Sequence, residues 1–361
     1  MSRIMKRRRD RVTAGAGALM LAAWLGAGAA FAQVPQPVVD GETIATPELV
    51  TAACAEGAVT YYTAQSDGDE RAIIEPFAKQ FSCIKVSVIS AVTGRLFERL
   101  ATEAAAGKTQ ADVAIITDEA LAQRLIDQRL ARPWTPPEAG KYPANAKGEG
   151  WWYAASGSLM YPFYNTELVA KDEVPKSWRD LLDPKWKGRI ATSPVTIGGT
   201  AWMQYDFMVK KLGGDYLEKF AAQEPKLFTA YDPVVLSVAR GETVIGVSSA
   251  LNEYSQRVRQ GAPVAPLYPP EGVPFTNYPM LLIAAAPHPH AGELFANWYL
   301  SKLGQSQLVA VRGAYSLRDD VPPAKGNPPL AELKPWNPGH DEILKDHDAL
   351  INTVSALVGQ R

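Results

Sequence analysis

The feature that most constrains the fold of this chain is an alternation of short apolar runs with amphipathic segments. Between residues 58 and 130, runs rich in β-branched and aromatic residues each precede a segment whose apolar residues have helical spacing. Continuous apolar strands are typical of a parallel sheet covered on both faces by helices. The alternation therefore predicts an α/β fold, with a central sheet flanked by helices. The predicted strands and helices are 58–64, 69–81, 84–90, 94–107, 111–117 and 119–130.

A second alternation begins near residue 188, after a strand-rich stretch at 151–165. It continues to a last predicted strand at 278–286 and a single helix predicted over 290–312. Two such patterns in a long chain indicate two α/β halves. The predicted segments of the second pattern are 188–192, 200–212, 215–223, 233–242, 243–249 and 251–261.

The first 32 residues have the pattern of a secretory signal peptide. A cluster of lysines and arginines precedes an apolar run, and Ala-Phe-Ala ends at Ala32. We expect cleavage after Ala32 and export to the periplasm, by the Sec or the Tat route. A retained membrane anchor is the alternative, because the apolar run is about as long as a membrane span.

Removal of this segment makes the chain acidic. The full sequence has a formal net charge of -1, and its first 32 residues carry six Lys or Arg and one Asp, so the remainder carries about -6. A negative chain is a poor partner for nucleic acid, which we therefore do not expect it to bind.

Two cysteines remain in the exported chain. Cys54 and Cys83 each stand just before a predicted strand. If those strands are parallel neighbours, both sulfur atoms lie at one edge of the sheet, within reach of a disulfide. The bridge would stabilise the fold by about 3–4 kcal/mol. Two buried thiols, or lipidation of Cys54, are the alternatives.

Enzyme motifs are missing from the sequence. The small-residue turn at 192–200 has no lysine, as a phosphate-binding P-loop would require, and no Gly-x-Ser-x-Gly elbow occurs. We expect structural or surface roles for the four histidines, and no catalysis, metal or cofactor. A secreted two-lobed hydrolase or transferase is the alternative class. The four histidines are His288, His290, His340 and His347.

Polar loops follow predicted strands in both halves. They lie at 63–69, 90–94, 192–200 and 248–252 and are rich in Ser, Thr and Gly. Ligands of open α/β sheets bind at the carboxyl ends of strands, where helices begin. A ligand held between the halves would therefore contact all four loops.

Three stretches resemble a known family. Leu182–Pro194 (LDPKWKGRIATSP), Val238–Val247 (VARGETVIGV) and Ala284–Gln307 are similar to the extracellular solute-binding proteins of bacterial ABC importers. The likeness extends over about 58–313, in the type 2 branch whose members bind ferric ion, phosphonates, phosphate esters, thiamine or polyamines.

The resemblance implies two lobes that close around one solute and deliver it to a membrane permease. It places hinge crossings at 156–165 and 275–280, and a monomer is expected. The implied divisions are a linker and short helix at 33–56, a first lobe at 57–155 plus 280–312, and a second lobe at 156–279 plus 313–361.

The resemblance also argues against direct iron binding. Ferric members of the family use a pair of tyrosines and a histidine, and these positions correspond here to Leu251, Asn252 and Ser66. Ferric iron prefers anionic oxygen ligands, which these residues do not supply. Hydroxyls and helix starts instead favour a small organic anion, such as a carboxylate, phosphonate or phosphate ester. A polyamine or a ferric complex is the alternative. The candidate ligand-binding residues are Ser66, Thr93, Gly94, Thr196, Gly199, Thr200, Tyr231, Ser248, Ser249 and Asn277.

Overall fold

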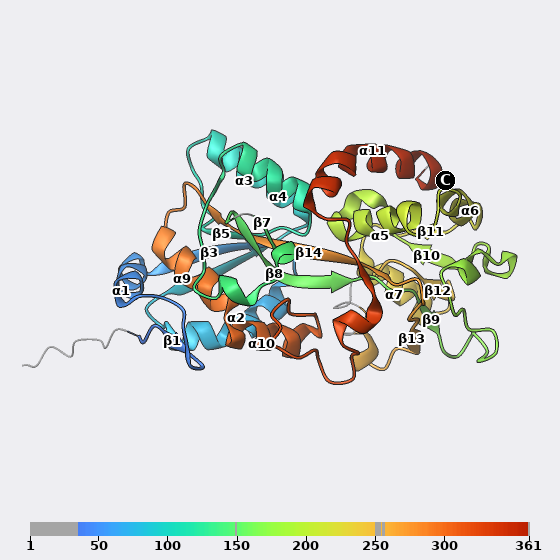
Figure 1. Ribbon diagram of the computed structural model, residues 1–361, viewed down its shortest axis with the longest axis horizontal. Helices are drawn as coiled ribbons and strands as arrows, with labels where there is room; N and C mark the ends of the chain where they lie inside the picture. The colour runs from blue at the N-terminus through green and yellow to red at the C-terminus, as the bar shows by residue number, and fades with distance from the viewer. Residues whose placement is uncertain (1–34, 149, 250–253, 255–256, 360–361) are drawn as a thin grey trace, which may run out of the picture. The chain divides into compact units, whose positions relative to one another are not determined.

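The computed structural model of the protein describes residues 35–148, 150–249, 254 and 257–359. They form a mixed α/β fold around two sheets, as predicted (Figure 1). We call the eight-stranded sheet with its helices the large lobe, and the five-stranded sheet with its helices the small lobe. No helix in the described part of the chain is both long and apolar enough to cross a membrane.

The large sheet combines early strands with one late strand. β3 (Ala58–Thr63) pairs in parallel with β4 (Lys85–Ser90) and β5 (Val113–Ile115), as the alternation predicts. The long strand β14 (Val273–Ile283) lies antiparallel between β5 and β8 (Trp152–Leu159). The other strands of this sheet are β6 (Ala131–Arg132), β7 (Lys147–Gly148) and β15 (Pro335–Trp336).

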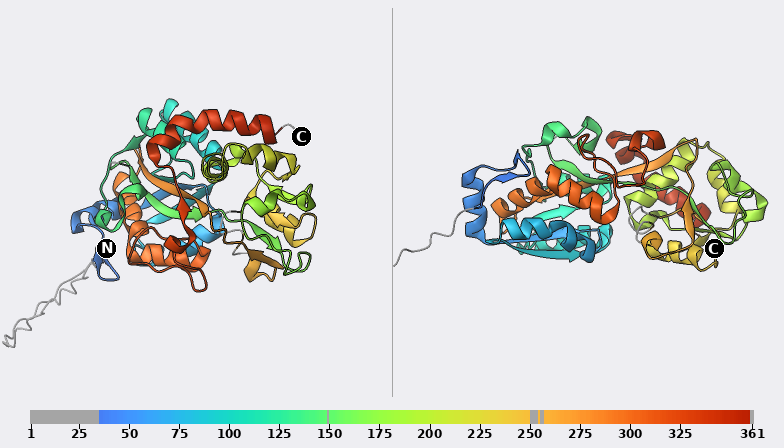
Figure 2. Two further views of the ribbon diagram at one scale, coloured as in Figure 1. Left: turned by 45° about the vertical axis from the view of Figure 1, so that its right-hand side comes forward. Right: turned by 90° about the horizontal axis from the view of Figure 1, so that it is seen from below.

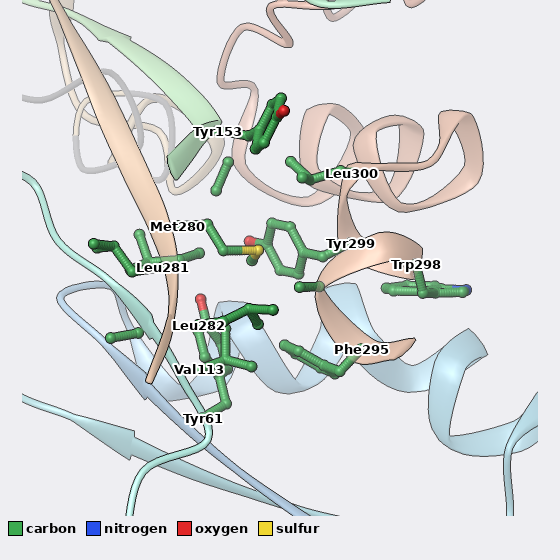
Figure 3. Close-up of a cluster of buried hydrophobic side chains, with 14 of the residues drawn as sticks. Tyr61, Val113, Tyr153, Met280, Leu281, Leu282, Phe295, Trp298, Tyr299 and Leu300 are labelled. Atoms are coloured by element: carbon green, nitrogen blue, oxygen red, sulfur yellow. The ribbon is translucent and has the colours of Figure 1, made fainter. Parts of the chain in front are cut away.

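An aromatic core holds helix α9 (Pro289–Leu300) against this sheet. Phe295 and Tyr299 of α9 pack on Tyr61 of β3, and Met280 of β14 points toward Tyr299 (Figure 3). Large aromatic side chains bury much apolar area, so this contact fixes the position of α9. The other helices of the large lobe are α1 (Pro47–Glu56), α2 (Asp67–Gln80), α3 (Thr93–Ala105), α4 (Glu119–Asp127) and α10 (Lys302–Arg312).

The small sheet has the order β11-β10-β12-β9-β13. Its helices are α5 (Gly199–Lys210), α6 (Tyr216–Ala222), α7 (Tyr231–Ala239) and α11 (His340–Val358). Most of α5 is buried, because α11 covers it and adds its own apolar side chains to the core. The strands are β9 (Phe163–Asn165), β10 (Ile190–Thr192), β11 (Lys226–Leu227), β12 (Ile245–Gly246) and β13 (Val264–Pro266).

The segment at 35–46 differs from the prediction of a linker. Its β1 (Val38–Val39) and β2 (Glu42–Thr43) form a two-stranded sheet. Ile44 is fully buried in the large-lobe core, and its carbonyl accepts a hydrogen bond from Asn297. The prolines and polar residues indicated an exposed segment, but a few aliphatic side chains anchor it to the lobe.

Two helical predictions near the C-terminus also need correction. The helix predicted over 290–312 is two helices, because Ser301 has extended backbone angles and its hydroxyl accepts a hydrogen bond from the Gly304 amide. This serine ends α9 and caps α10. Residues 313–361, in which no helix was predicted, contain α11, a helix of 19 residues.

The disulfide prediction is confirmed. Cys54 in α1 is bonded to Cys83, with 5.2 Å between the Cα atoms. Cys54 precedes β3 and Cys83 precedes β4, and these two strands pair in parallel.

The exact lobe boundaries stay a prediction. β8 and β14 pair with each other in the large sheet on both sides of the proposed divisions at 155 and 280, from Tyr153–Met280 to Leu159–Phe275.

Candidate functional site

A cavity of about 210 Å³ lies where helix starts and strand ends of the two lobes meet. We call it the central cavity. The large lobe contributes the ends of β3 and β5, the start of α3 and one residue of β14. The small lobe contributes the starts of α5 and α7. Its lining residues are Ala64, Gln65, Val92, Thr93, Thr117, Ile197, Thr200, Thr229, Ala230, Tyr231, Asp232 and Tyr278.

Three helices begin at this cavity without a side-chain cap. The N-cap residues are Val92 for α3, Gly198 for α5 and Ala230 for α7, and none of them makes a side-chain hydrogen bond to its helix. The first amides of a helix lack partners inside the helix, and the helix dipole is positive at this end. Three such ends around one cavity make it a favourable place for an anion.

Hydroxyl groups in the cavity are arranged in pairs. The Thr93 and Thr117 hydroxyls lie 2.7 Å apart, and the Thr117 amide donates to Thr93 Oγ1 at 3.2 Å. The Thr200 hydroxyl lies 3.0 Å from that of Tyr278. Because each hydroxyl carries one proton, only one proton lies between the two oxygens of a pair. The Thr93–Thr117 pair therefore retains a second O–H group, which suits the binding of an acceptor such as an oxyanion.

One charged side chain lines the described part of the cavity. The carboxylate of Asp232, in the first turn of α7, accepts hydrogen bonds from Nε and Nη2 of Arg257, both at 2.7 Å. Such bidentate pairs are among the stronger ion contacts. The negative charge of Asp232 is therefore largely balanced by Arg257, so it does little to repel an anion.

The two lobes touch at the edge of the cavity. A Cβ atom on Gly199 would lie 2.2 Å from the carbonyl oxygen of Thr117, so only glycine allows this approach. The Thr200–Tyr278 hydroxyl pair joins the same two lobes, since Thr200 belongs to α5 and Tyr278 to β14. The cavity therefore changes shape if the lobes separate.

The structure brings some of the candidate residues together. Thr93, Thr200 and Tyr231 line the central cavity, and Gly199 lies at its edge against Thr117. Thr93, Gly199 and Thr200 belong to two of the predicted polar loops, and Tyr231 was a candidate from the family resemblance.

The other candidates lie elsewhere. Ser66, Gly94 and Thr196 are exposed and do not line the cavity. Ser248 is fully buried and hydrogen-bonds to Thr192 and Gln204, inside the small lobe.

Ser249 and Asn277 are also buried outside the central cavity. The Asn277 amide donates to Glu119 Oε1 and to the Asn145 carbonyl, and it lines a different cavity of about 370 Å³. Leu251 and Asn252, where ferric relatives carry tyrosines, lie outside the described residues.

Sequence reasoning missed five polar lining residues, which are Gln65, Thr117, Thr229, Asp232 and Tyr278. Gln65 and Thr117 follow β3 and β5, so the carboxyl-end rule could have included them. Asp232 was not among the candidate residues, and nothing in the sequence indicated its pairing with Arg257. Tyr278 was hidden in an apolar strand, where only the tertiary contact with Thr200 reveals it.

The family is shown by comparison with known proteins. The family model for bacterial extracellular solute-binding proteins matches residues 72–333. The chain therefore belongs to this family of solute-binding proteins.

Within its described residues, no three His, Cys, Asp or Glu side chains are grouped so that they could hold a metal ion.

The individual relatives have low sequence identity to this chain. An uncharacterized protein of Haemophilus influenzae is 32% identical over 178 residues, which is 46% of this chain and 50% of that protein. A periplasmic protein of Salmonella typhimurium, proposed to bind 2-aminoethylphosphonate, is 25% identical over 310 residues, covering 80% of this chain and 89% of the relative.

Solved structures agree in fold. The periplasmic binding protein AfuA of Actinobacillus pleuropneumoniae, with fructose-6-phosphate bound, has a TM-score of 0.74 at 20% identity, covering 84% of this chain and 99% of that one. Iron-bound HitA of Pseudomonas aeruginosa has a TM-score of 0.71 at 21% identity, covering 82% of this chain and 99% of that one. The predicted two-lobed fold of a type 2 periplasmic binding protein is therefore confirmed.

Proposed function

We propose that this chain captures a small organic anion in the central cavity and delivers it to the permease of an ABC importer. The observation that carries this proposal is the convergence of three uncapped helix starts, those of α3, α5 and α7, on one cavity. Backbone amides and hydroxyls there donate hydrogen bonds, and the single lining carboxylate is already paired with Arg257.

The size of the cavity narrows the class of solute. Sites for drug-sized ligands have volumes of about 300–1,000 Å³, and the central cavity has about 210 Å³. A solute with few heavy atoms fits this volume better than thiamine does. The Salmonella relative, proposed to bind 2-aminoethylphosphonate, supports a phosphonate head group.

Cationic solutes fit the described lining less well. A polyamine needs several carboxylates, and ferric iron needs several anionic oxygen ligands. Among the described lining residues, Asp232 is the only carboxylate, and it is bound by Arg257. We therefore place an organic anion before a polyamine or a ferric complex.

A thermal-shift screen of the chain lacking residues 1–32 tests this proposal. The compounds are 2-aminoethylphosphonate, methylphosphonate, glycerol phosphate, small carboxylates, spermidine and ferric citrate. A solute at 100 times its Kd stabilises the folded state by about 2.7 kcal/mol. A shift with an anion supports the proposal, whereas a shift with spermidine or ferric citrate alone would overturn the anion assignment.

Two threonines of one loop provide matched variants. Thr200→Val removes a hydroxyl from the cavity and is expected to weaken binding of the screened anion about fivefold to tenfold, as the loss of one hydrogen bond implies. Thr196→Val changes an exposed residue outside the cavity and should leave the Kd unchanged. Equal Kd values for the two variants would place the solute elsewhere.

We also propose that the mature chain begins at Gln33, resides in the periplasm, and acts as a monomer without cofactor or catalysis. The pattern ending at Ala32 and the membership in a family of binding proteins support these points. Intact mass of periplasmic protein tests the cleavage, and light scattering during gel filtration tests the monomer.

A further inference from the structure

The C-terminal helix α11 connects the two lobes. Its apolar side chains Ile343, Leu350 and Val354 are buried in the small-lobe core together with Trp202 of α5. Its other side meets α4 of the large lobe, and Figures 1 and 2 show α11 beside both α4 and α5. A helix anchored in one lobe thus reaches the other.

Ion contacts join α11 to the first turns of α4. His347 Nε2 lies 3.1 Å from Asp118 Oδ2, and His340 Nδ1 lies 3.2 Å from Glu119 Oε2. Asp118 and His347 are both buried, with 5% and 6% exposure. The seam between the lobes at this place therefore depends on histidine–carboxylate pairs.

Asp118 connects this seam to the central cavity. It directly follows Thr117, and its Oδ1 accepts hydrogen bonds from the amides of Ala120 and Leu121, so it also caps α4. Thr117 lines the cavity, and its carbonyl lies against Gly199, the first residue of α5. Displacing Asp118 would therefore move the contact between the two walls of the cavity.

Both ring nitrogens of His347 face carboxylates. Nε2 faces Asp118, and Nδ1 lies 2.9 Å from Oδ1 of Asp348. Carboxylates only accept hydrogen bonds, and a neutral imidazole has one N–H, so only the protonated ring satisfies both contacts. Loss of the proton therefore breaks one of the two contacts.

The other groups around His347 do not reverse this preference. On α4, Glu119 is paired with His340, and Arg124 binds Asp348 at 2.8 and 3.0 Å. On α5, the Trp202 ring stacks on His347 and its Nε1 donates to the His347 carbonyl.

The remaining charged groups of α5 form a separate cluster, in which Asp206 and Lys210 bind each other and partners on α11 and β15. Burial lowers the pKa of His347, but the hydrogen bonds and charges of Asp118 and Asp348 outweigh it and raise the pKa above its ordinary value.

We propose that His347 and Asp118 are positioning residues of the central cavity. While the His347 ring is protonated, its contact with Asp118 holds α5 against Thr117, so the protein binds its solute more tightly in acid. The proposal rests on the proposed function, since it concerns the same cavity. The contact is complete below about pH 6.5, the ordinary value for histidine, and is lost as the pH rises through the raised pKa of His347.

Solute affinity over pH tests this inference. The Kd for 2-aminoethylphosphonate is measured by calorimetry from pH 5.5 to 8.5 in the wild type, His347→Gln and Asp118→Asn. Relative to His347→Gln, in which ionisation of the solute remains, wild-type affinity should fall about fivefold on going to high pH, as the loss of one hydrogen bond implies. Asp118→Asn keeps an oxygen for the α4 cap and should have the same reduced pH dependence as His347→Gln.

His290→Gln is the matched control. His290 also pairs with a carboxylate, Glu56 at 2.7 Å, but both belong to the large lobe, and the histidine is half-exposed. Its pH profile should equal that of the wild type. Equal profiles in the wild type and His347→Gln would overturn the inference.

A second measurement separates this inference from the proposed function. Spin labels on Lys108→Cys and Lys187→Cys, both exposed and on different lobes, report the distance between the lobes without any solute. We expect a broader distance distribution at high pH in the wild type and at every pH in His347→Gln. This result would support the role of the His347–Asp118 contact in holding the lobes together. If no anion binds at any pH, the proposed function fails. If the distance distribution does not change with pH or with His347→Gln, the role of the His347–Asp118 contact is rejected, whether or not an anion binds.

Discussion

The interior of the large lobe and the contact between the lobes are held by interactions of different strength. Inside the large lobe, Glu70 and Arg312 form an ion pair with at most 2% exposure, and a disulfide joins α1 to the start of β4. Between the lobes, the contacts near the cavity include a hydroxyl pair, a close backbone approach, histidine–carboxylate pairs and the exposed ion pair of Arg124 with Asp348. Individual hydrogen bonds contribute only about 1 kcal/mol.

This difference separates a scaffold from a movable contact. A bound solute shifts a conformational equilibrium only by the difference in its affinity for the two states. Contacts of about 1 kcal/mol are small enough for one small anion to outweigh. The large lobe, by contrast, stays folded whether or not a solute is bound, because its bonds are covalent or fully buried.

Breaking the buried ion pair of Glu70 and Arg312 should cause the largest loss in the free energy of unfolding. Arg312→Met leaves the Glu70 carboxylate without its partner in the core, and breaking such a pair costs about 3–5 kcal/mol. Urea unfolding measures this loss in the free energy of unfolding. The double variant Arg312→Met/Glu70→Gln should recover part of it, because no buried charge remains. A loss below about 1 kcal/mol would contradict the scaffold assignment.

Reduction of the disulfide comes next. Opening the Cys54–Cys83 loop, with a sequence separation of 29 residues, should cost about 3–4 kcal/mol of unfolding free energy. Solute preference should not change, since neither cysteine lines the central cavity. The double variant Cys54→Ala/Cys83→Ala, studied by urea unfolding and the same solute screen, distinguishes the two effects. An altered order of preferred solutes would link the bridge to the cavity.

Gly199→Ala should disrupt the contact between the lobes. The new Cβ would overlap the Thr117 carbonyl, and overpacking of this kind costs about 1–3 kcal/mol. We expect weaker anion binding and a longer distance between the spin labels, with each lobe still folded. Gly94→Ala is the control, because a Cβ there has no neighbour within 4 Å. If both variants bind equally well, the close approach is not required.

The smallest expected effects come from removing one of two hydroxyl contacts, one inside the large lobe and one between the lobes. Thr93→Val breaks a bond inside the large lobe and should lower the free energy of unfolding by about 1 kcal/mol without changing the distance between the lobes. Thr200→Val breaks a bond between the lobes, so it should broaden that distance instead. Denaturation and spin-label measurements on both variants test the distinction, which identical responses would remove.

Local sequence patterns predicted much of the fold. The alternation of strands and helices over 58–130 matches β3 to α4, because burial of a parallel sheet imposes apolar strands and amphipathic helices. The same reasoning placed both cysteines at one sheet edge. It failed at Ser301 and at residues 35–46, where one capping side chain or a few buried aliphatic residues decide the outcome.

The candidate site was less accessible to prediction. Thr93 and Thr200 were found because helices that begin after strands point toward the carboxyl edge of a sheet, whereas Tyr231 was found from the family resemblance. Ser66 and Thr196 satisfied the same rule but are exposed, since residue type and position do not determine which way a side chain points. Asn277 faces a different cavity on β14 from Tyr278, because successive strand residues point to opposite faces.

By itself, the sequence determined the fold class, the family, the disulfide partners and the helix starts, because each leaves a pattern in neighbouring residues. Tertiary structure alone decided the pairing of Asp232 with Arg257, the approach of Gly199 to Thr117 and the contact of His347 with Asp118. Each of these contacts joins residues from separate parts of the chain. Asp232 and Arg257 meet within the small lobe, whereas the other two contacts depend on how the lobes pack.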